Sequence, residues 1–140
     1  MSRSPLLAVA AVTAALACSD AFAPTIQNVS GLYFARSFTS DSAGVTKDWF
    51  GLGATLGLSL NPNGSVAGLL ILPRFPNDPA PPIEHLTGTW TLTRDTVHFT
   101  QDADTFVRDM DWVVTENRLS GDKTFKDVRI RAVLTKLYTP

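Results

Sequence analysis

The sequence of 140 residues has few of the residue types that carry metal, redox or nucleic-acid chemistry. It contains one cysteine, so neither an internal disulfide nor a thiolate metal cage can form within the chain. Lys and Arg number 12 against 13 Asp and Glu, and this balance lacks the basic excess of a nucleic-acid binder. Charged residues make up only 18% and hydrophobic residues 44%, which excludes a wholly disordered chain. The length is that of one domain.

Sequence motifs of catalysis are missing as well. There is no Gly-rich phosphate loop and no Gly-x-Ser-x-Gly elbow. The two histidines, His85 and His98, have no further metal-ligating residues at the spacing of a metal site. Asp102 and Asp104 have the spacing of the first two ligands of a calcium-binding loop, but the third ligand and the Gly that follows it are missing. We therefore expect no metal, no cofactor and no enzymatic activity. Catalysis stays open only if His98, Asp102 and Asp104 converge in a pocket.

The N-terminal segment holds the longest apolar run. Eleven of the 13 residues from Pro5 to Ala17 are apolar, and Arg3 is the only charged residue before Cys18. The run is too short to span a bilayer as a mature helix. A basic start, an apolar centre and small residues before a break are typical of a secretory signal peptide.

Two cleavage points compete in this segment. Ala21-Phe22-Ala23 has the small-x-small pattern, but Pro24 follows it directly and disfavours cleavage there. Ala15-Leu16-Ala17-Cys18 resembles the lipobox of bacterial lipoproteins, which implies that Cys18 is acylated and anchors the chain to membrane lipid. We predict a signal peptide over residues 1–17, a lipidated tether over 18–28 and a folded domain over 29–140. With Ser19 after the cysteine, the resemblance implies the outer membrane of a bacterial cell envelope.

The remaining sequence shows a period of two residues, which is typical of half-buried strands. The clearest case alternates Thr87, Thr89, Thr91 and Thr93 with Leu86, Gly88, Trp90 and Leu92. Turn sequences separate such stretches at Asn61-Pro62-Asn63-Gly64, Arg94-Asp95 and Glu116-Asn117. The pattern predicts eight strands, over residues 31–39, 56–60, 65–72, 86–93, 96–101, 106–114, 118–121 and 128–137. We predict an all-β fold, an antiparallel up-and-down barrel rather than a sandwich, because sequential hairpins dominate and closure removes exposed edges.

The order of these hairpin motifs is similar to that of small lipocalin-like lipoproteins of bacterial envelopes. The motifs are Gly31-Leu32-Tyr33, Leu58 to Ser65, Gly88 to Leu92, Asp95 to Thr100 and Asn117 to Gly121. The resemblance implies a calycin-type barrel with an interior that accepts an apolar ligand. It also implies that an arginine of the last strand, Arg129 or Arg131, packs over Tyr33.

One basic residue falls on a face that is otherwise apolar. Alternation over residues 106–114 places Arg108 beside Phe106, Met110 and Trp112, and an inward arginine must be paired or hydrated. We predict a ligand site formed by Arg108, Phe106, Trp112 and Trp90, in which the guanidinium binds a ligand carboxylate. The alternatives are a bulge that changes the register, or a rim arginine paired with Asp109 or Glu116.

Two further segments allow a functional and a structural interpretation. Residues 73–82 hold five of the nine prolines and form either a lid at the barrel mouth or a stiffened connection. A basic C-terminal hairpin either faces anionic lipid headgroups or is a solvated surface, and its residues are Lys123, Lys126, Arg129, Arg131 and Lys136.

Two function classes fit these observations. The first is a membrane-tethered, monomeric barrel that binds a small apolar or acyl ligand. The second is a structural or protein-interaction lipoprotein of the envelope, with a core filled by side chains, because an eight-stranded interior suits either occupant.

Overall fold

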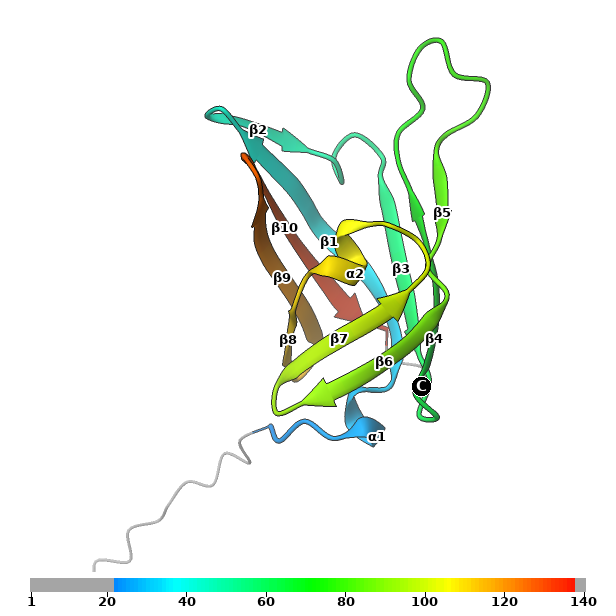
Figure 1. The fold of residues 1–140 in the computed structure, drawn as a ribbon, viewed down its shortest axis with the longest axis vertical. Helices are drawn as coiled ribbons and strands as arrows, with labels where there is room; N and C mark the ends of the chain where they lie inside the picture. The colour runs from blue at the N-terminus through cyan, green and yellow to red at the C-terminus, as the bar shows by residue number, and fades with distance from the viewer. Residues whose placement is uncertain (1–21, 138–140) are drawn as a thin grey trace, which may run out of the picture.

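The computed structural model describes residues 22–137, and Cys18 with the predicted signal peptide lies outside them. Eight antiparallel strands form a closed barrel in up-and-down order (Figure 1), which confirms the predicted fold class. The barrel strands are β1 (Gly31–Ser42), β3 (Thr55–Leu60), β4 (Ser65–Ile71), β6 (Gly88–Thr93), β7 (Thr96–Gln101), β8 (Trp112–Thr115), β9 (Arg118–Phe125) and β10 (Val128–Lys136). Two short strands, β2 (Val45–Asp48) and β5 (Ile83–His85), pair with β1 and β4. No helix among residues 22–137 is long and apolar enough to cross a membrane.

The tight turns predicted from the sequence join the strands. Gly64 ends the β3–β4 turn with φ of 88°, and Arg94 opens the β6–β7 turn with φ of 57°. Both values lie in the left-handed region that such turns require. In the strand pairs that these turns join, Leu60 lies opposite Val66 and Trp90 lies opposite Phe99. Inward-facing residues therefore lie opposite each other across each hairpin.

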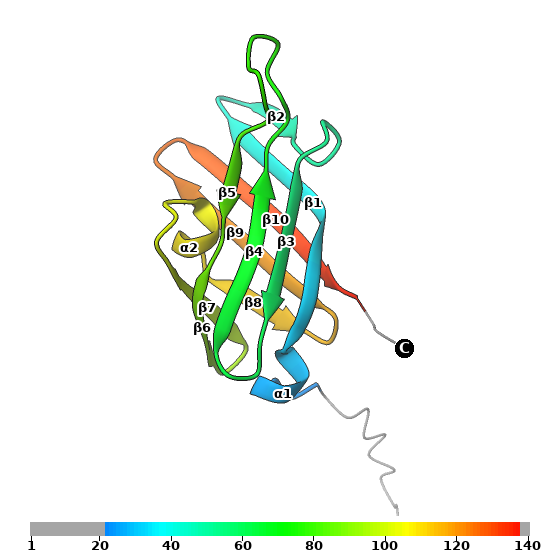
Figure 2. The ribbon, with the colours of Figure 1, turned by 90° about the vertical axis from the view of Figure 1, so that its right-hand side faces the viewer.

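The lower half of the barrel is filled by side chains. Inward alternation along β3 buries Leu56 nearer the mouth and Leu58 and Leu60 toward the lower end, as the sequence predicts. The helix α1 (Ile26–Val29) lies beneath this end, and the Tyr33 hydroxyl donates a hydrogen bond to the Val29 carbonyl at 2.6 Å. Figure 2 shows α1 at one end of the barrel and the loop between β4 and β5 at the other. Within the segment predicted to be a tether, Phe22 packs against the core and the Asn28 carbonyl accepts a hydrogen bond from Lys136 Nζ at 2.7 Å.

The structure corrects the strand predicted over residues 106–114. Its first part is a helical turn, α2 (Phe106–Asp109), and only β8 from Trp112 onward is extended. Strand β8 pairs with β7 only through Thr96 and Val97, so the barrel wall parts beyond these residues. Val107 and Met110 are buried in that gap. Apolar residues four positions apart lie on the same face of a helix and also on the same face of a strand. This ambiguity explains the wrong prediction.

The strand predicted over 86–93 begins at Gly88 as β6, and residues 86 and 87 separate it from β5, a short strand that was not predicted. Strand β5 pairs with the upper part of β4, and β6 pairs with Ser65 and Val66 at its lower end. At the break the Leu86 amide donates to the Gly68 carbonyl at 2.9 Å. Residues 73–82, between β4 and β5, form no strand, as their prolines predict.

Candidate functional site

A cavity of about 480 Å³ lies at the end of the barrel opposite α1. We call it the mouth cavity. Its walls come from β1, β4, β5, the α2 region and the β9–β10 hairpin, which together surround the open end. The apolar side chains that line it are Phe38, Trp49, Leu70, Leu72, Phe106, Phe125, Val128 and Ile130. A volume of this size is in the range of small-molecule sites.

Aromatic rings form a continuous row across the mouth cavity. The Phe38 ring lies 4.9 Å from that of Phe106 on α2 and 6.2 Å from that of Trp49, measured between centroids. The Trp49 indole donates a hydrogen bond from Nε1 to Ser40 Oγ at 2.8 Å. Both the stacking and this hydrogen bond hold Trp49 in place, although it lies outside the regular strands.

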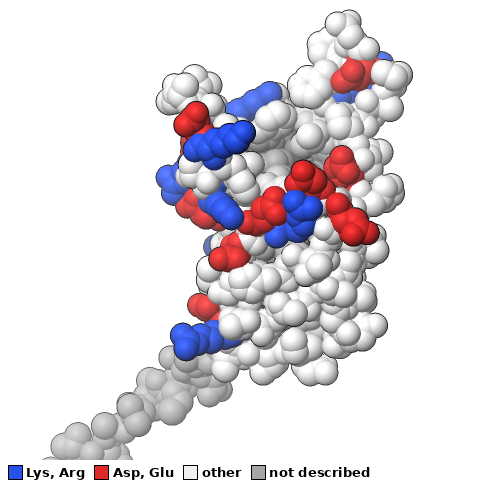
Figure 3. Space-filling model, viewed as in Figure 1, with Lys and Arg blue, Asp and Glu red and all other residues white. Residues whose placement is uncertain are grey.

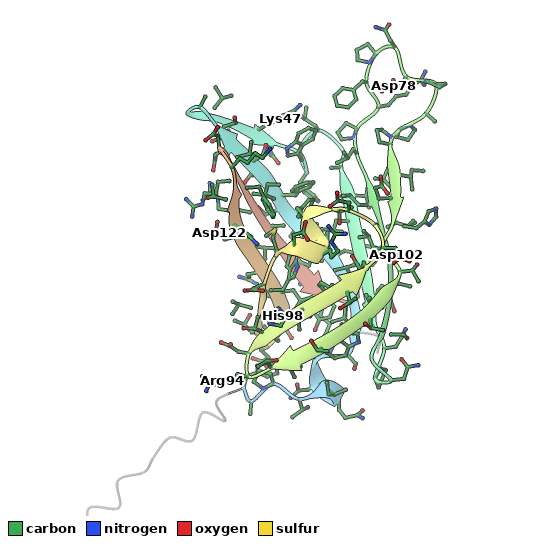
Figure 4. The ribbon with its side chains drawn as sticks, in the orientation of Figure 1. Lys47, Asp78, Arg94, His98, Asp102 and Asp122 are labelled. Carbon is green, nitrogen blue, oxygen red and sulfur yellow. The ribbon has the colours of Figure 1, made fainter. Side chains whose placement is uncertain are left out.

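A lysine continues this row toward the Pro-rich loop. Lys47 Nζ lies 3.9 Å from the centroid of the Trp49 ring and 5.8 Å from that of Phe75. Lys47 comes from β2 and Phe75 from the loop between β4 and β5, and both elements stand above the barrel end (Figure 4). The cation–π contacts therefore connect the two elements that border the mouth.

The polar groups that line the mouth cavity include three carboxylates, of Glu84, Asp104 and Asp109. Thr105 also lines it, and its Oγ1 is buried without a hydrogen-bond partner among the described residues. A buried hydroxyl without a partner is uncommon in folded proteins. The cavity thus combines an apolar, aromatic wall with a small number of acidic and hydroxyl groups.

Arg108 lies beside this cavity but does not line it. Its guanidinium contacts Asp104 Oδ1 at 2.6 Å and Asp109 Oδ1 at 2.9 Å. The hydrogen bond from Arg108 lowers the pKa of the Asp109 carboxyl, and the same bond raises the pKa of Arg108. Asp109 is the last residue of the α2 turn and Asp104 lies just before its extended N-cap residue Thr105, so carboxylates from both sides of the turn reach Arg108. The structure therefore shows the alternative in which Arg108 is paired with Asp109.

The two predicted tryptophans lie in the filled core and do not line the mouth cavity. Trp90 donates from Nε1 to the Asn61 carbonyl at 2.9 Å, and Trp112 donates to the Val107 carbonyl at 3.0 Å. Of the four residues predicted to bind a ligand, only Phe106 faces the cavity. Sequence reasoning missed Phe38 and Trp49. Phe38 lies within the strand predicted over residues 31–39, whereas Trp49 belongs to no stretch with a period of two residues.

The polar groups proposed for catalysis or metal binding do not converge. His98 Nδ1 lies 2.9 Å from Asp111 Oδ1 on the outer surface, where both side chains are exposed. No group of three or more metal-ligating side chains occurs within residues 22–137. His98 thus has the solvated strand position that its alternation predicts.

The arginines of the last strand have acidic partners. Arg129 pairs with Asp122 at 2.6 Å, and Arg131 pairs with Asp41 at 3.0 Å. Hydrogen bonding from Arg129 lowers the pKa of Asp122. Over the Tyr33 ring lies instead the ammonium of Lys136, 5.9 Å from the ring centroid. Figure 3 shows basic and acidic side chains interleaved over this upper part of the molecule, which favours a solvated surface over a purely basic one.

A second apolar depression, of about 510 Å³, lies on the outer wall of the barrel. We call it the outer groove. Gly57 and Gly68 form its floor, and a Cβ at Gly68 would lie 2.2 Å from the Gly57 carbonyl oxygen, so the strands approach closely there. Its apolar sides are Leu32, Phe34, Leu69 and Ile71.

No family of known proteins, no curated protein and no solved structure matches the chain. The class defined by the fold and the site is an eight-stranded antiparallel β-barrel, filled at one end and hollow at the other.

Proposed function

We propose that this protein is a non-enzymatic, membrane-anchored lipoprotein of the bacterial envelope whose barrel binds a small apolar or acyl ligand. The observation that carries the proposal is the mouth cavity, which is open, aromatic and large enough for one small molecule. The resemblance of the hairpin motifs to lipocalin-like lipoproteins supports the same function.

The contrast between the two ends of the barrel supports binding at the mouth. Trp112, Tyr33 and Leu58 are fully buried in the lower half, where side chains occupy the interior. At the mouth, Trp49, Leu72 and Phe106 remain partly exposed. Apolar and aromatic groups that stay accessible in a concave site lose contact with water when a ligand covers them.

We expect the purified protein to retain an apolar small molecule that denaturation releases. Native mass spectrometry of the intact protein, followed by solvent extraction and mass spectrometry of the extract, measures this directly. A bound species of constant mass, present at up to one copy per chain, would support the proposal. Apoprotein alone, together with no uptake of added apolar probes, would contradict it.

The proposed anchor is the Cys18 thiol, acylated after removal of residues 1–17. We expect radiolabelled palmitate to be incorporated into the wild-type protein and not into the Cys18→Ala variant. Globomycin, which blocks lipoprotein signal peptidase, should leave a larger precursor of the wild-type protein. Unchanged size together with no label in the wild type would contradict a lipid anchor and would leave ligand binding unaffected.

The alternative function is that of a structural or protein-interaction lipoprotein. The outer groove favours it, because Leu32 and Leu69 are about two-fifths exposed there. Under this alternative the mouth would be empty in the purified protein. The mass measurement therefore separates the two functions.

A further inference from the structure

Every charged side chain that lines the mouth cavity is acidic. Glu84 belongs to β5, and Asp104 and Asp109 stand before and at the end of α2. Among the described residues, no lysine or arginine lines the cavity. A ligand that enters it therefore meets carboxylates at closest range.

The basic groups next to these carboxylates are already engaged. Arg108 contacts both Asp104 and Asp109, and Lys123 Nζ donates to the Asp109 carbonyl at 2.7 Å. A ligand carboxylate would have to displace an aspartate from Arg108 and then lie beside the remaining acids, which is unfavourable. Glu84 has no ion pair among the described residues and is free to accept one.

The aromatic rings that line the cavity also favour a positively charged ligand. The ammonium of Lys47 lies 3.9 Å from the Trp49 ring centroid, so this ring already accepts a cation on one face. Phe38 and Phe106 continue the row of aromatic rings beside Trp49.

We propose that the mouth cavity selects an amphipathic organic cation, with an apolar body on the aromatic wall and an ammonium group near Glu84 and Asp104. The proposal deepens the ligand-binding function proposed above and rests on it. It reverses the charge that the sequence suggested, because the arginine expected to bind a ligand carboxylate is held by two carboxylates of the protein itself.

The test compares three ligands with the same decyl chain, kept below their micelle concentrations. Decyltrimethylammonium, decanol and decanoate are titrated into the full-length protein at pH 7, with isothermal calorimetry as the readout. We expect decyltrimethylammonium to bind about tenfold or more tightly than decanoate. Decanoate binding as tightly as the ammonium would overturn the charge preference and leave the mouth site standing, whereas binding of none of the three would overturn the ligand-binding function itself.

Variants assign the preference to particular carboxylates. Glu84→Gln should weaken decyltrimethylammonium binding about three- to tenfold and leave decanol binding unchanged. Glu116→Gln, in the β8–β9 turn at the opposite end of the barrel, is the matched control and should change neither. The double variant Asp104→Asn, Asp109→Asn releases Arg108 and should shift the preference toward decanoate. Equal effects of Glu84→Gln and Glu116→Gln, or no shift in the double variant, would overturn the assignment.

Discussion

Replacing Trp112 with alanine is expected to lower the free energy of unfolding by about 3–5 kcal/mol. The indole is fully buried and packs edge-on against Phe99, with 6.4 Å between the ring centroids. It also covers Gly121 on β9, where a Cβ would come within 3.1 Å of the indole ring. Its removal leaves a cavity in the filled half of the barrel, and it leaves the Val107 carbonyl without the 3.0 Å bond from Nε1.

Urea denaturation followed by circular dichroism measures this effect. Trp112→Phe keeps part of the packing and loses only the hydrogen bond and some volume, so a smaller loss is expected. Trp49→Ala is the matched control at the mouth, where the side chain is half-buried. A Trp112→Ala variant as stable as Trp49→Ala would contradict the division into a filled and a hollow half.

Filling the mouth cavity is expected to remove ligand binding without unfolding the barrel. Leu72 follows β4 and Ile130 belongs to β10, and both line the cavity from different walls. Two indoles at these positions, in the double variant Leu72→Trp, Ile130→Trp, would occupy the space that a ligand needs. We expect affinity for the neutral probe N-phenyl-1-naphthylamine to fall by at least about tenfold, the equivalent of about 1.4 kcal/mol.

A partly exposed site tolerates such substitutions better than the packed core does. Leu72 and Ile130 lie at the edge of the core, not within it, and larger side chains there can extend into the cavity. Retention of a cooperative urea transition in the double variant is the required control. With the fold intact, loss of probe binding then reports on the cavity alone.

Alternation and turn chemistry were sufficient to predict the hairpins of the barrel. Strand β3 and the β6–β7 hairpin follow a period of two on both faces, and Gly64 supplies the positive φ of the β3–β4 turn. These signals are local, so they can be read from a single sequence. The closing pair of β1 with β10 joins distant segments and was inferred only from the preference for closed sheets.

The site was predicted less well, because its residues depend on tertiary context. Phe106 and Arg108 were placed on a strand, whereas the parting of β7 from β8 allows α2 to form there. That turn brings Arg108 to two aspartates and takes it out of the cavity. Trp49 has no periodic neighbours and directly follows β2, so the pairing of β1 with β2 brings its ring onto Phe38.

We propose that the hollow end of the barrel, and not its outer wall, holds the ligand. A fluorescence titration of N-phenyl-1-naphthylamine into two variants tests it most directly. The mouth variant is Leu72→Trp, Ile130→Trp, and the matched control is Ser59→Trp, which fills the outer groove instead. We expect the mouth variant to lose probe binding and the Ser59→Trp variant to bind the probe like the wild type. Loss of binding in Ser59→Trp, with full binding in the mouth variant, would contradict it.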